Sequence, residues 1–143
     1  MRKFMFFAVF VLSLALVLAA CGGGGDTASD SSGDSGALVG NPTRGEKLYA
    51  QTTIGKASAP GCVTCHSLTP DVVLVGPSHA GVGVRAATYV EGMTAEEYLY
   101  ESLTHPDTHI VDGFTPGVMY QNYAAELNAQ EIADLVAYLL TLQ

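Results

Sequence analysis

The hydrophobic and polar positions divide the chain into three stretches. From Phe4 to Ala20, 17 residues follow one another with only Ser13 polar. From Gly22 to Ala37, six Gly, four Ser and three Asp leave almost nothing to bury, so a flexible linker is expected there. From Gly40 to Gln143 apolar and polar residues are mixed, and the pattern predicts a single domain of 104 residues.

Start and stop signals predict two helices in the first part of this domain. One follows Pro42, a residue that is tolerated at a helix start, and runs near Thr43 to Gln51. The other begins at Thr94, whose hydroxyl can pair with Glu97 three residues later in a capping box. It ends before His105, because the proline that follows disfavours helical backbone at the residue before it.

A third helix near the C-terminus has the clearest periodicity. Asn128 and Glu131 form a second capping box at its start. Apolar residues then recur at the spacing i, i+3, i+4, i+7 and i+8 of an amphipathic helix, namely Ile132, Leu135, Val136, Leu139 and Leu140. The face that they form is expected to pack on the rest of the domain.

Stretches rich in Gly and Pro separate these helices, at residues 55–61, 70–83 and 106–117. The single strand-like run, Val72 to Val75, is short and enclosed by turn residues. The predicted fold class is therefore all-α, with three to four short helices and a large share of loop. Because a domain of this size with so little regular structure does not easily close a dense core, a bound group is expected to fill its centre.

The apolar leader has the features of an export signal. Basic residues precede it, and small residues end it in Leu18-Ala19-Ala20-Cys21. This end resembles the lipobox of bacterial lipoproteins, in which the signal is cut before the Cys and the thiol receives a diacylglycerol. The resemblance implies a signal peptide at residues 1–20, and a lipidated Cys21 with its linker at 21–39. An uncleaved transmembrane anchor is the alternative, although 17 apolar residues are at the short limit for spanning a bilayer.

Composition and charge narrow the function classes. The chain carries 6 Lys and Arg against 14 Asp and Glu, a net charge of −8, which argues against nucleic-acid binding. Of its residues 48% are hydrophobic, and residues 1–20 supply 17 of these 69. The composition excludes a multi-pass membrane protein and a large multidomain enzyme. Without the leader, 4 basic and 14 acidic residues remain, a charge of −10, and partners with basic docking surfaces are expected.

The candidate chemistry lies in the run Cys62-Val63-Thr64-Cys65-His66. Cys-x-x-Cys-His is the attachment motif of c-type haem. The two thiols add across the two vinyl groups of the haem and form thioethers, and the adjacent His donates an imidazole nitrogen to the iron. A haem bound here would supply the apolar centre that the loop-rich domain needs.

Two other interpretations of this motif stay open. In an exported protein Cys62 and Cys65 could form a disulfide or a redox pair. A thioredoxin-like pair would need a strand before the motif, and residues 55–61 have no strand pattern. A zinc site would need four ligands, which the two Cys and two of the histidines could supply. The histidines are His66, His79, His105 and His109.

Residues 40–143 resemble a class I c-type cytochrome, a mono-haem electron carrier. That family has an N-terminal helix, the attachment motif, a loop-rich middle, a loop with the distal Met, and a C-terminal helix that crosses the first. This sequence has each in order. Gly45 and Tyr49 resemble the family's contact between the first helix and an aromatic residue of the last, here Tyr138. In the family, the carbonyl of a Pro that matches Pro77 accepts a hydrogen bond from the proximal His.

The resemblance also implies roles for the site residues. Cys62 and Cys65 would hold one haem c covalently, and His66 would be the proximal ligand of the iron. Arg85 stands where the family often has an Arg that approaches a haem propionate, and a solvated Arg is the alternative. His79 is expected at a surface next to the haem.

Met119 is the predicted sixth ligand, because it matches the family's distal-ligand loop in place and in context. Met93 lies just before the Thr94 cap and is instead expected to pack on Tyr98 of the helix that follows. The family commonly has Pro directly after the ligand Met, and Tyr120 stands there in this chain. A His ligand or an open iron site is the alternative.

With His and Met as ligands the iron has no open position. The predicted function is therefore the transfer of single electrons between respiratory or photosynthetic redox partners, with no enzymatic reaction, no small-molecule substrate and no nucleic acid. The alternatives are a fixed haem subunit of a quinol-oxidising or terminal oxidase complex, and a sensor or catalytic haem protein with an open iron site. The expected location is the outer face of the cytoplasmic membrane or the periplasm, with the lipid on Cys21 as the anchor.

Overall fold

The computed structural model describes residues 38–143. The predicted signal peptide, the predicted lipidation site Cys21 and most of the predicted linker lie outside these residues. Every element below belongs to one compact unit, which ends at Gln143. Within the described residues, no helix has both the length and the apolar character to cross a membrane.

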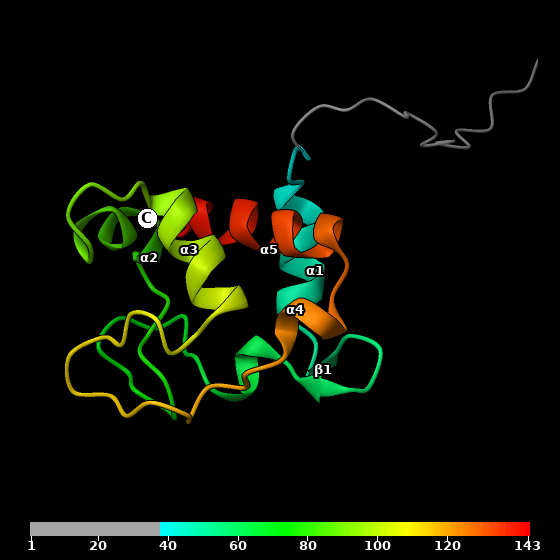
Figure 1. The fold of residues 1–143 in the computed structure, drawn as a ribbon, viewed down its shortest axis with the longest axis horizontal. Helices are drawn as coiled ribbons and strands as arrows, with labels where there is room; N and C mark the ends of the chain where they lie inside the picture. The colour runs from blue at the N-terminus through cyan, green and yellow to red at the C-terminus, as the bar shows by residue number, and fades with distance from the viewer. Residues whose placement is uncertain (1–37) are drawn as a thin grey trace, which may run out of the picture. The chain divides into compact units, whose positions relative to one another are not determined.

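The described residues form a helical domain with one very short hairpin (Figure 1). The all-α, loop-rich fold is confirmed, and the structure adds two single-turn α-helices, α2 and α4, to the three that the sequence predicts. In chain order the elements are α1 (Pro42–Tyr49), β1 (Thr53–Ile54), β2 (Ala59–Pro60), the 3-10 helix η1 (Cys62–Thr64), α2 (Val82–Arg85), the 3-10 helix η2 (Ala86–Thr88), α3 (Ala95–Thr104), α4 (Tyr123–Glu126) and α5 (Ala129–Thr141).

The three predicted helices begin at polar caps. The side chain of Asn41 accepts a hydrogen bond from the first turn of α1. Both capping boxes are complete: Thr94 and Glu97 bond reciprocally at the start of α3, and Asn128 and Glu131 do so at the start of α5. Because each cap satisfies backbone N–H groups that the helix leaves without partners, these boundaries could be predicted from the sequence.

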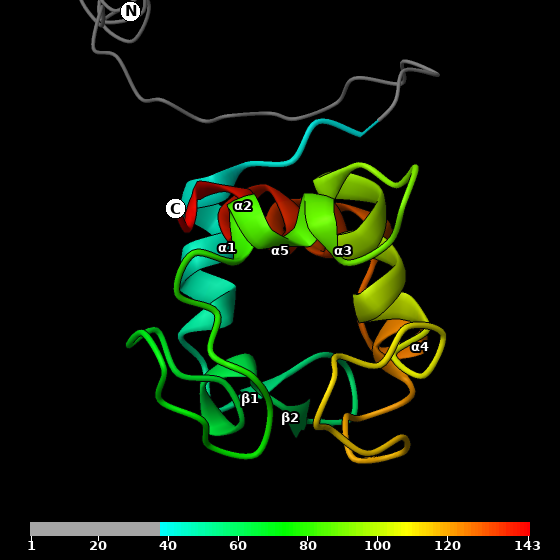
Figure 2. The same cartoon turned by 90° about the vertical axis from the view of Figure 1, so that its left-hand side faces the viewer.

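Helices α1 and α5 cross at close range (Figures 1 and 2). A Cβ at Gly45 would lie 1.9 Å from the carbonyl oxygen of Asp134 and 2.8 Å from the Cβ of Tyr138, so only glycine lets the helices approach this closely. The rings of Tyr49 and Tyr138 meet beside the crossing, with centroids 5.2 Å apart and planes at 57°. The contact that the family resemblance implied for Gly45, Tyr49 and Tyr138 is present.

A buried carboxylate joins the two helices at the crossing. Asp134 on α5 accepts hydrogen bonds from the backbone N–H of Asn41 (2.7 Å) and from Nε and Nη2 of Arg44 (2.7 and 3.0 Å). Gln130 donates a further bond to it at 2.9 Å. Burial alone would raise the pKa of Asp134, but these hydrogen bonds outweigh burial and hold that pKa below its usual value. The carboxylate therefore stays charged and fixes the start of α1 on α5.

The prediction that no strand precedes the attachment motif was wrong. β1 and β2 pair antiparallel just before Cys62, with Ile54 opposite Ala59. Their buried side chains, Ile54 and Ala59, point to the core. With two residues each, these strands are too short to produce the apolar and polar alternation by which a strand is identified in a sequence.

The strand-like run at residues 72–75 forms no strand. Its hydrogen bonds go elsewhere: the N–H groups of Val75 and Gly76 both donate to the carbonyl of Cys65 (3.2 and 2.9 Å). The run therefore folds back onto the attachment motif as a loop. Its four apolar side chains are 41–58% exposed, so the run covers no core of its own.

The helices pack around an apolar core to which α1, α3 and α5 all contribute. Tyr49 and Leu135 are its largest fully buried side chains. Seen from the side in Figure 2, α5 lies along one edge of the domain, and the loops that follow η1 and α3 lie along the opposite edge. The core thus occupies the helical side, and the site described next lies between the helices and the loops.

Candidate functional site

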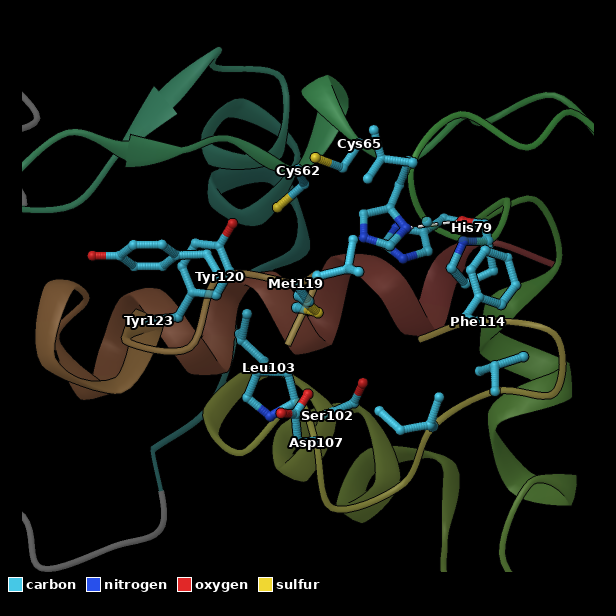
Figure 3. A pocket seen from close by; sticks show the side chains of 18 of the residues that line it. Cys62, Cys65, His79, Ser102, Leu103, Asp107, Phe114, Met119, Tyr120 and Tyr123 are labelled. Atoms are coloured by element: carbon cyan, nitrogen blue, oxygen red, sulfur yellow. Dashed lines mark hydrogen bonds between the residues drawn. The ribbon is translucent and has the colours of Figure 1, made fainter. Parts of the chain in front are cut away.

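A cavity of about 760 Å³ lies between the helices and the loops. Apolar side chains of α2, α3 and α5 form part of its wall: Val82, Leu99, Leu103, Leu135 and Leu139. The rest comes from the attachment motif and from loop residues 75–79 and 106–122 (Figure 3). The volume falls within the range of about 300–1,000 Å³ that is common for cofactor sites.

The attachment motif folds as a tight turn that brings both thiols to this cavity (Figure 3). The N–H groups of Cys65 and His66 both donate to the carbonyl of Cys62, at 3.1 and 2.9 Å. Gly61 precedes the turn, and a Cβ there would lie 1.8 Å from the carbonyl oxygen of Gln51. Burial raises the pKa of Cys62 to about 11, so it is a neutral thiol at pH 7.

His66 is held with one ring nitrogen occupied. Its Nδ1 lies 2.8 Å from the carbonyl oxygen of Pro77, and a carbonyl only accepts, so Nδ1 carries the hydrogen. Burial lowers the pKa of His66 more than this hydrogen bond raises it, so the ring is neutral. Its Nε2 then has a free lone pair, the form in which imidazole binds a metal. The hydrogen bond that the resemblance implied for Pro77 is present.

Met119 lines the same cavity as Cys62, Cys65 and His66 (Figure 3). Met93 is not among the residues that line it and packs against the apolar core, while its predicted contact with Tyr98 stays a prediction. Among the described methionines, only Met119 is therefore placed to meet a group bound by the attachment motif. A neutral imidazole, a thioether and two thiols around one apolar cavity fit the donor set of a c-type haem.

Comparison with known proteins agrees with this chemistry. Residues 42–143 match the sequence profile of the family described as Cytochrome c. The chain belongs to the cytochrome c family. No curated protein matches the chain. The family binds covalent haem c, with one haem typical of a single domain, and haem-based electron transfer is typical of its members.

In this cytochrome, Arg85 supports the loop that follows Pro77. Its guanidinium donates to the carbonyls of Ala80 and Ser78, the latter at 2.8 Å, and its Nε donates to the hydroxyl of Tyr89 at 3.3 Å. Arg85 is not one of the cavity-lining residues. The structure therefore shows it bracing a cavity wall, and its predicted approach to a haem propionate stays a prediction.

His79 is more enclosed than the sequence suggested. Its ring stacks on that of His66, with centroids 3.9 Å apart and planes at 14°, and its Nδ1 lies 3.1 Å from the hydroxyl of Tyr49. Burial, together with the nearby His66 and Arg85, lowers the pKa of His79 to about 3. The ring is a neutral, half-buried part of the cavity wall.

The two other interpretations of the motif find no support in the described residues. Cys62 and Cys65 are both free cysteines there, and neither is in a disulfide. Within residues 38–143 no three His, Cys, Asp or Glu side chains are grouped so as to hold a metal ion, whereas a zinc site needs four ligands. His105 caps the end of α3, as predicted, and His109 contacts Glu101 at 3.4 Å.

Sequence reasoning missed the polar residues that shape the loop around Met119. Asp107 and Gln121 bond to that loop and to each other, and Tyr120 donates to Glu126 at 3.2 Å. These contacts join residues from 2 to 14 positions apart, most of them in irregular backbone. Neither periodicity nor a capping pattern marks such contacts, so the sequence held no signal for them.

Proposed function

We propose that this cytochrome is tethered to a membrane and passes single electrons between redox proteins through one haem. The haem would be attached by Cys62 and Cys65 and ligated by His66 and Met119. The observation that carries the proposal is that all four side chains line one apolar cavity. The bound haem supplies an iron that cycles between its ferrous and ferric states.

The side chains around the haem would favour electron transfer and would keep other molecules from binding to the iron. Pro77 orients His66 and makes its imidazole a stronger donor, because the hydrogen bond raises ligand basicity. A thioether ligand and an apolar cavity favour the ferrous form, which raises the reduction potential relative to ligation by two histidines. With His66 and Met119 as its two protein ligands, the iron would have no position left for a substrate.

The cavity reaches the protein surface beside the attachment motif and the Met119 loop. Val75 and Val118 both line it, and they are 52% and 55% exposed. This apolar opening supports electron exchange with partners that dock there. The described residues carry 4 basic and 11 acidic side chains, a charge of −7, which supports partners with basic docking surfaces.

A redox titration tests this function. The purified holoprotein should take up one electron per chain reversibly, and its ferrous form should not bind carbon monoxide. Rapid binding of carbon monoxide would instead support the open iron site of a sensor or catalytic haem protein. Recovery of the protein in a stable complex with a quinol-oxidising enzyme or a terminal oxidase, after mild detergent extraction, would support a fixed subunit over a shuttle.

The tether is proposed from the leader alone. The lipobox-like end at Cys21 supports a lipoprotein that is exported to the outer face of the cytoplasmic membrane or the periplasm. Two or three acyl chains would anchor it stably, whereas one would not. Mass spectrometry of the mature protein should show a lipid on Cys21 and no residues before it. Retention of residues 1–20 would show an uncleaved anchor.

A further inference from the structure

The loop that carries Met119 lacks the backbone hydrogen bonds that usually hold a protein segment in place. Among the described residues, no backbone–backbone hydrogen bond involves residues 115–121. Tyr120 stands where the family commonly has Pro, so the chain also lacks the fixed φ that Pro would provide after Met119. Something else must keep this loop in one conformation.

Two side chains do so. One carboxylate oxygen of Asp107, Oδ1, accepts hydrogen bonds from the backbone N–H of Gly117 (2.8 Å) and from Nε2 of Gln121 (3.2 Å). The same Nε2 of Gln121 donates to the carbonyl oxygen of Met119 at 2.8 Å. The backbone is therefore held at Gly117 and at Met119, and the side chain of Gln121 links the carbonyl of Met119 to Asp107.

The loop is anchored in this way to a fixed part of the domain. Asp107 follows the buried Pro106 directly after α3, and the N–H of Thr108 donates to the carbonyl of His105 at 3.0 Å. Gly117 has φ +76°, a left-handed conformation that glycine adopts readily, and its N–H meets Asp107 from that conformation. Figure 3 shows Asp107 and Met119 among the side chains of the same cavity.

We propose that Asp107 and Gln121 are positioning residues that hold Met119 in the cavity, in the role that the family gives to the proline. The inference rests on Met119 as the sixth ligand, which is part of the proposed function. Without Asp107 or Gln121 the loop opens more often, and Met119 leaves the ligand position more often. The iron itself, the attachment motif and His66 are unaffected.

The rate at which the ferric holoprotein binds added imidazole tests this role, because imidazole binds only when Met119 has left. The Asp107→Ala variant loses two hydrogen bonds and Gln121→Ala loses two, so each should bind imidazole about tenfold faster than the wild type. Asp107→Asn keeps the acceptor oxygen and should restore a rate near that of the wild type. Asp112→Ala removes the same charge from an exposed position of the same stretch that does not line the cavity, and should leave the rate unchanged.

Wild-type imidazole binding in both Asp107→Ala and Gln121→Ala would overturn the inference. Equal acceleration by Asp112→Ala would also overturn it, because loss of charge alone would then explain the effect. If Asp107→Ala fails to accumulate, Gln121→Ala alone decides, since the side chain of Gln121 is exposed. A ferric spectrum that does not change in Met119→Ala is a separate failure, because it would refute the ligand assignment on which the inference rests.

Discussion

A single hydrogen bond determines which nitrogen of His66 is available to a metal. The carbonyl of Pro77 occupies Nδ1, and burial keeps the ring neutral, so Nε2 presents its lone pair. The ring also needs space beside Gly76, where a Cβ would lie 2.4 Å from Cε1 of His66. In the Gly-Pro pair, Gly76 thus leaves space for the ring of His66, and Pro77 supplies the carbonyl that orients it.

The Gly76→Ala substitution tests whether the ring of His66 needs the space that Gly76 leaves. The added methyl group must displace the imidazole, and overpacking of this kind costs about 1–3 kcal/mol. We expect a holoprotein that is less stable by this amount in denaturant unfolding, with an altered ferric spectrum. Val73→Ala, a change at an exposed residue of the same loop that does not line the cavity, is the matched control and should alter neither. A Gly76→Ala protein with wild-type stability and spectrum would contradict the account.

Sequence reasoning identified the residues of the site that follow from a local pattern. Cys62, Cys65 and His66 stand at fixed spacing, and Pro77 follows from the family's order of segments. It did not foresee the stacking of His79 on His66, since this contact depends on how the loop after Pro77 folds back over 13 residues. Contacts of this kind are fixed by tertiary packing and leave no mark in a single sequence.

At the scale of elements, the crossing of α1 and α5 depends on one small residue and one charged group. Gly45 allows the close approach, and Asp134 ties the first turn of α1 to α5. Helices this short are marginal in isolation, so their stability comes from packing against each other. The first and last helices of the domain therefore pack against each other, and α5 also supplies part of the cavity wall.

The charge of Asp134 predicts a pH-dependent stability. Its pKa is lower in the folded chain than in the unfolded one, so it stabilises the fold above its unfolded pKa, and this contribution is lost as the pH falls through the folded pKa. Asp134→Asn should unfold more easily than the wild type at pH 7, by about 1–2 kcal/mol. The difference should shrink steadily below pH 4, where the wild-type carboxylate also becomes neutral.

Denaturant unfolding of both proteins from pH 7 to pH 3 measures this difference. Glu46→Gln, a change at an exposed acid of α1, is the control and should follow the wild type. A difference between Asp134→Asn and the wild type that stays constant with pH would contradict the role given to the charge.

The elements that could be predicted are those with signals inside their own segments. The capping boxes of α3 and α5 and the periodicity of α5 marked both helices within a residue of their true starts. The hairpin β1–β2 and the single turns α2 and α4 are two to four residues long, too short for any period to show. Packing in the folded domain, rather than local preference, selects their conformation.

At the scale of the whole molecule, the cavity explains how a loop-rich domain can have a core. Apolar side chains of three helices face a space of about 760 Å³, and these walls would lack contact partners without a bound group. The haem that the family binds is therefore part of the fold as well as the site of electron transfer. The excess of acidic residues is also a property of the whole molecule, because their summed charge attracts or repels a partner before the two proteins touch.

The acidic character predicts that electron transfer depends on salt. Attraction between this protein and a redox partner with a Lys-rich docking face speeds their encounter, and salt screens it. Raising the ionic strength from low to physiological values should therefore slow stopped-flow electron transfer by about tenfold. A partner with an acidic face is the control and should react faster as salt is added. A rate with the Lys-rich partner that does not change with salt would contradict this prediction.

The central claim is that Cys62, Cys65, His66 and Met119 hold one haem in the cavity. The absorption spectrum of the ferric holoprotein, recorded for the wild type and for Met119→Ala, tests it most directly. The account predicts a weak long-wavelength band from the bond between iron and Met in the wild type. In Met119→Ala this band is lost, while the haem stays attached to the denatured chain. A wild-type spectrum without the band, or a band that survives in Met119→Ala, would contradict the account.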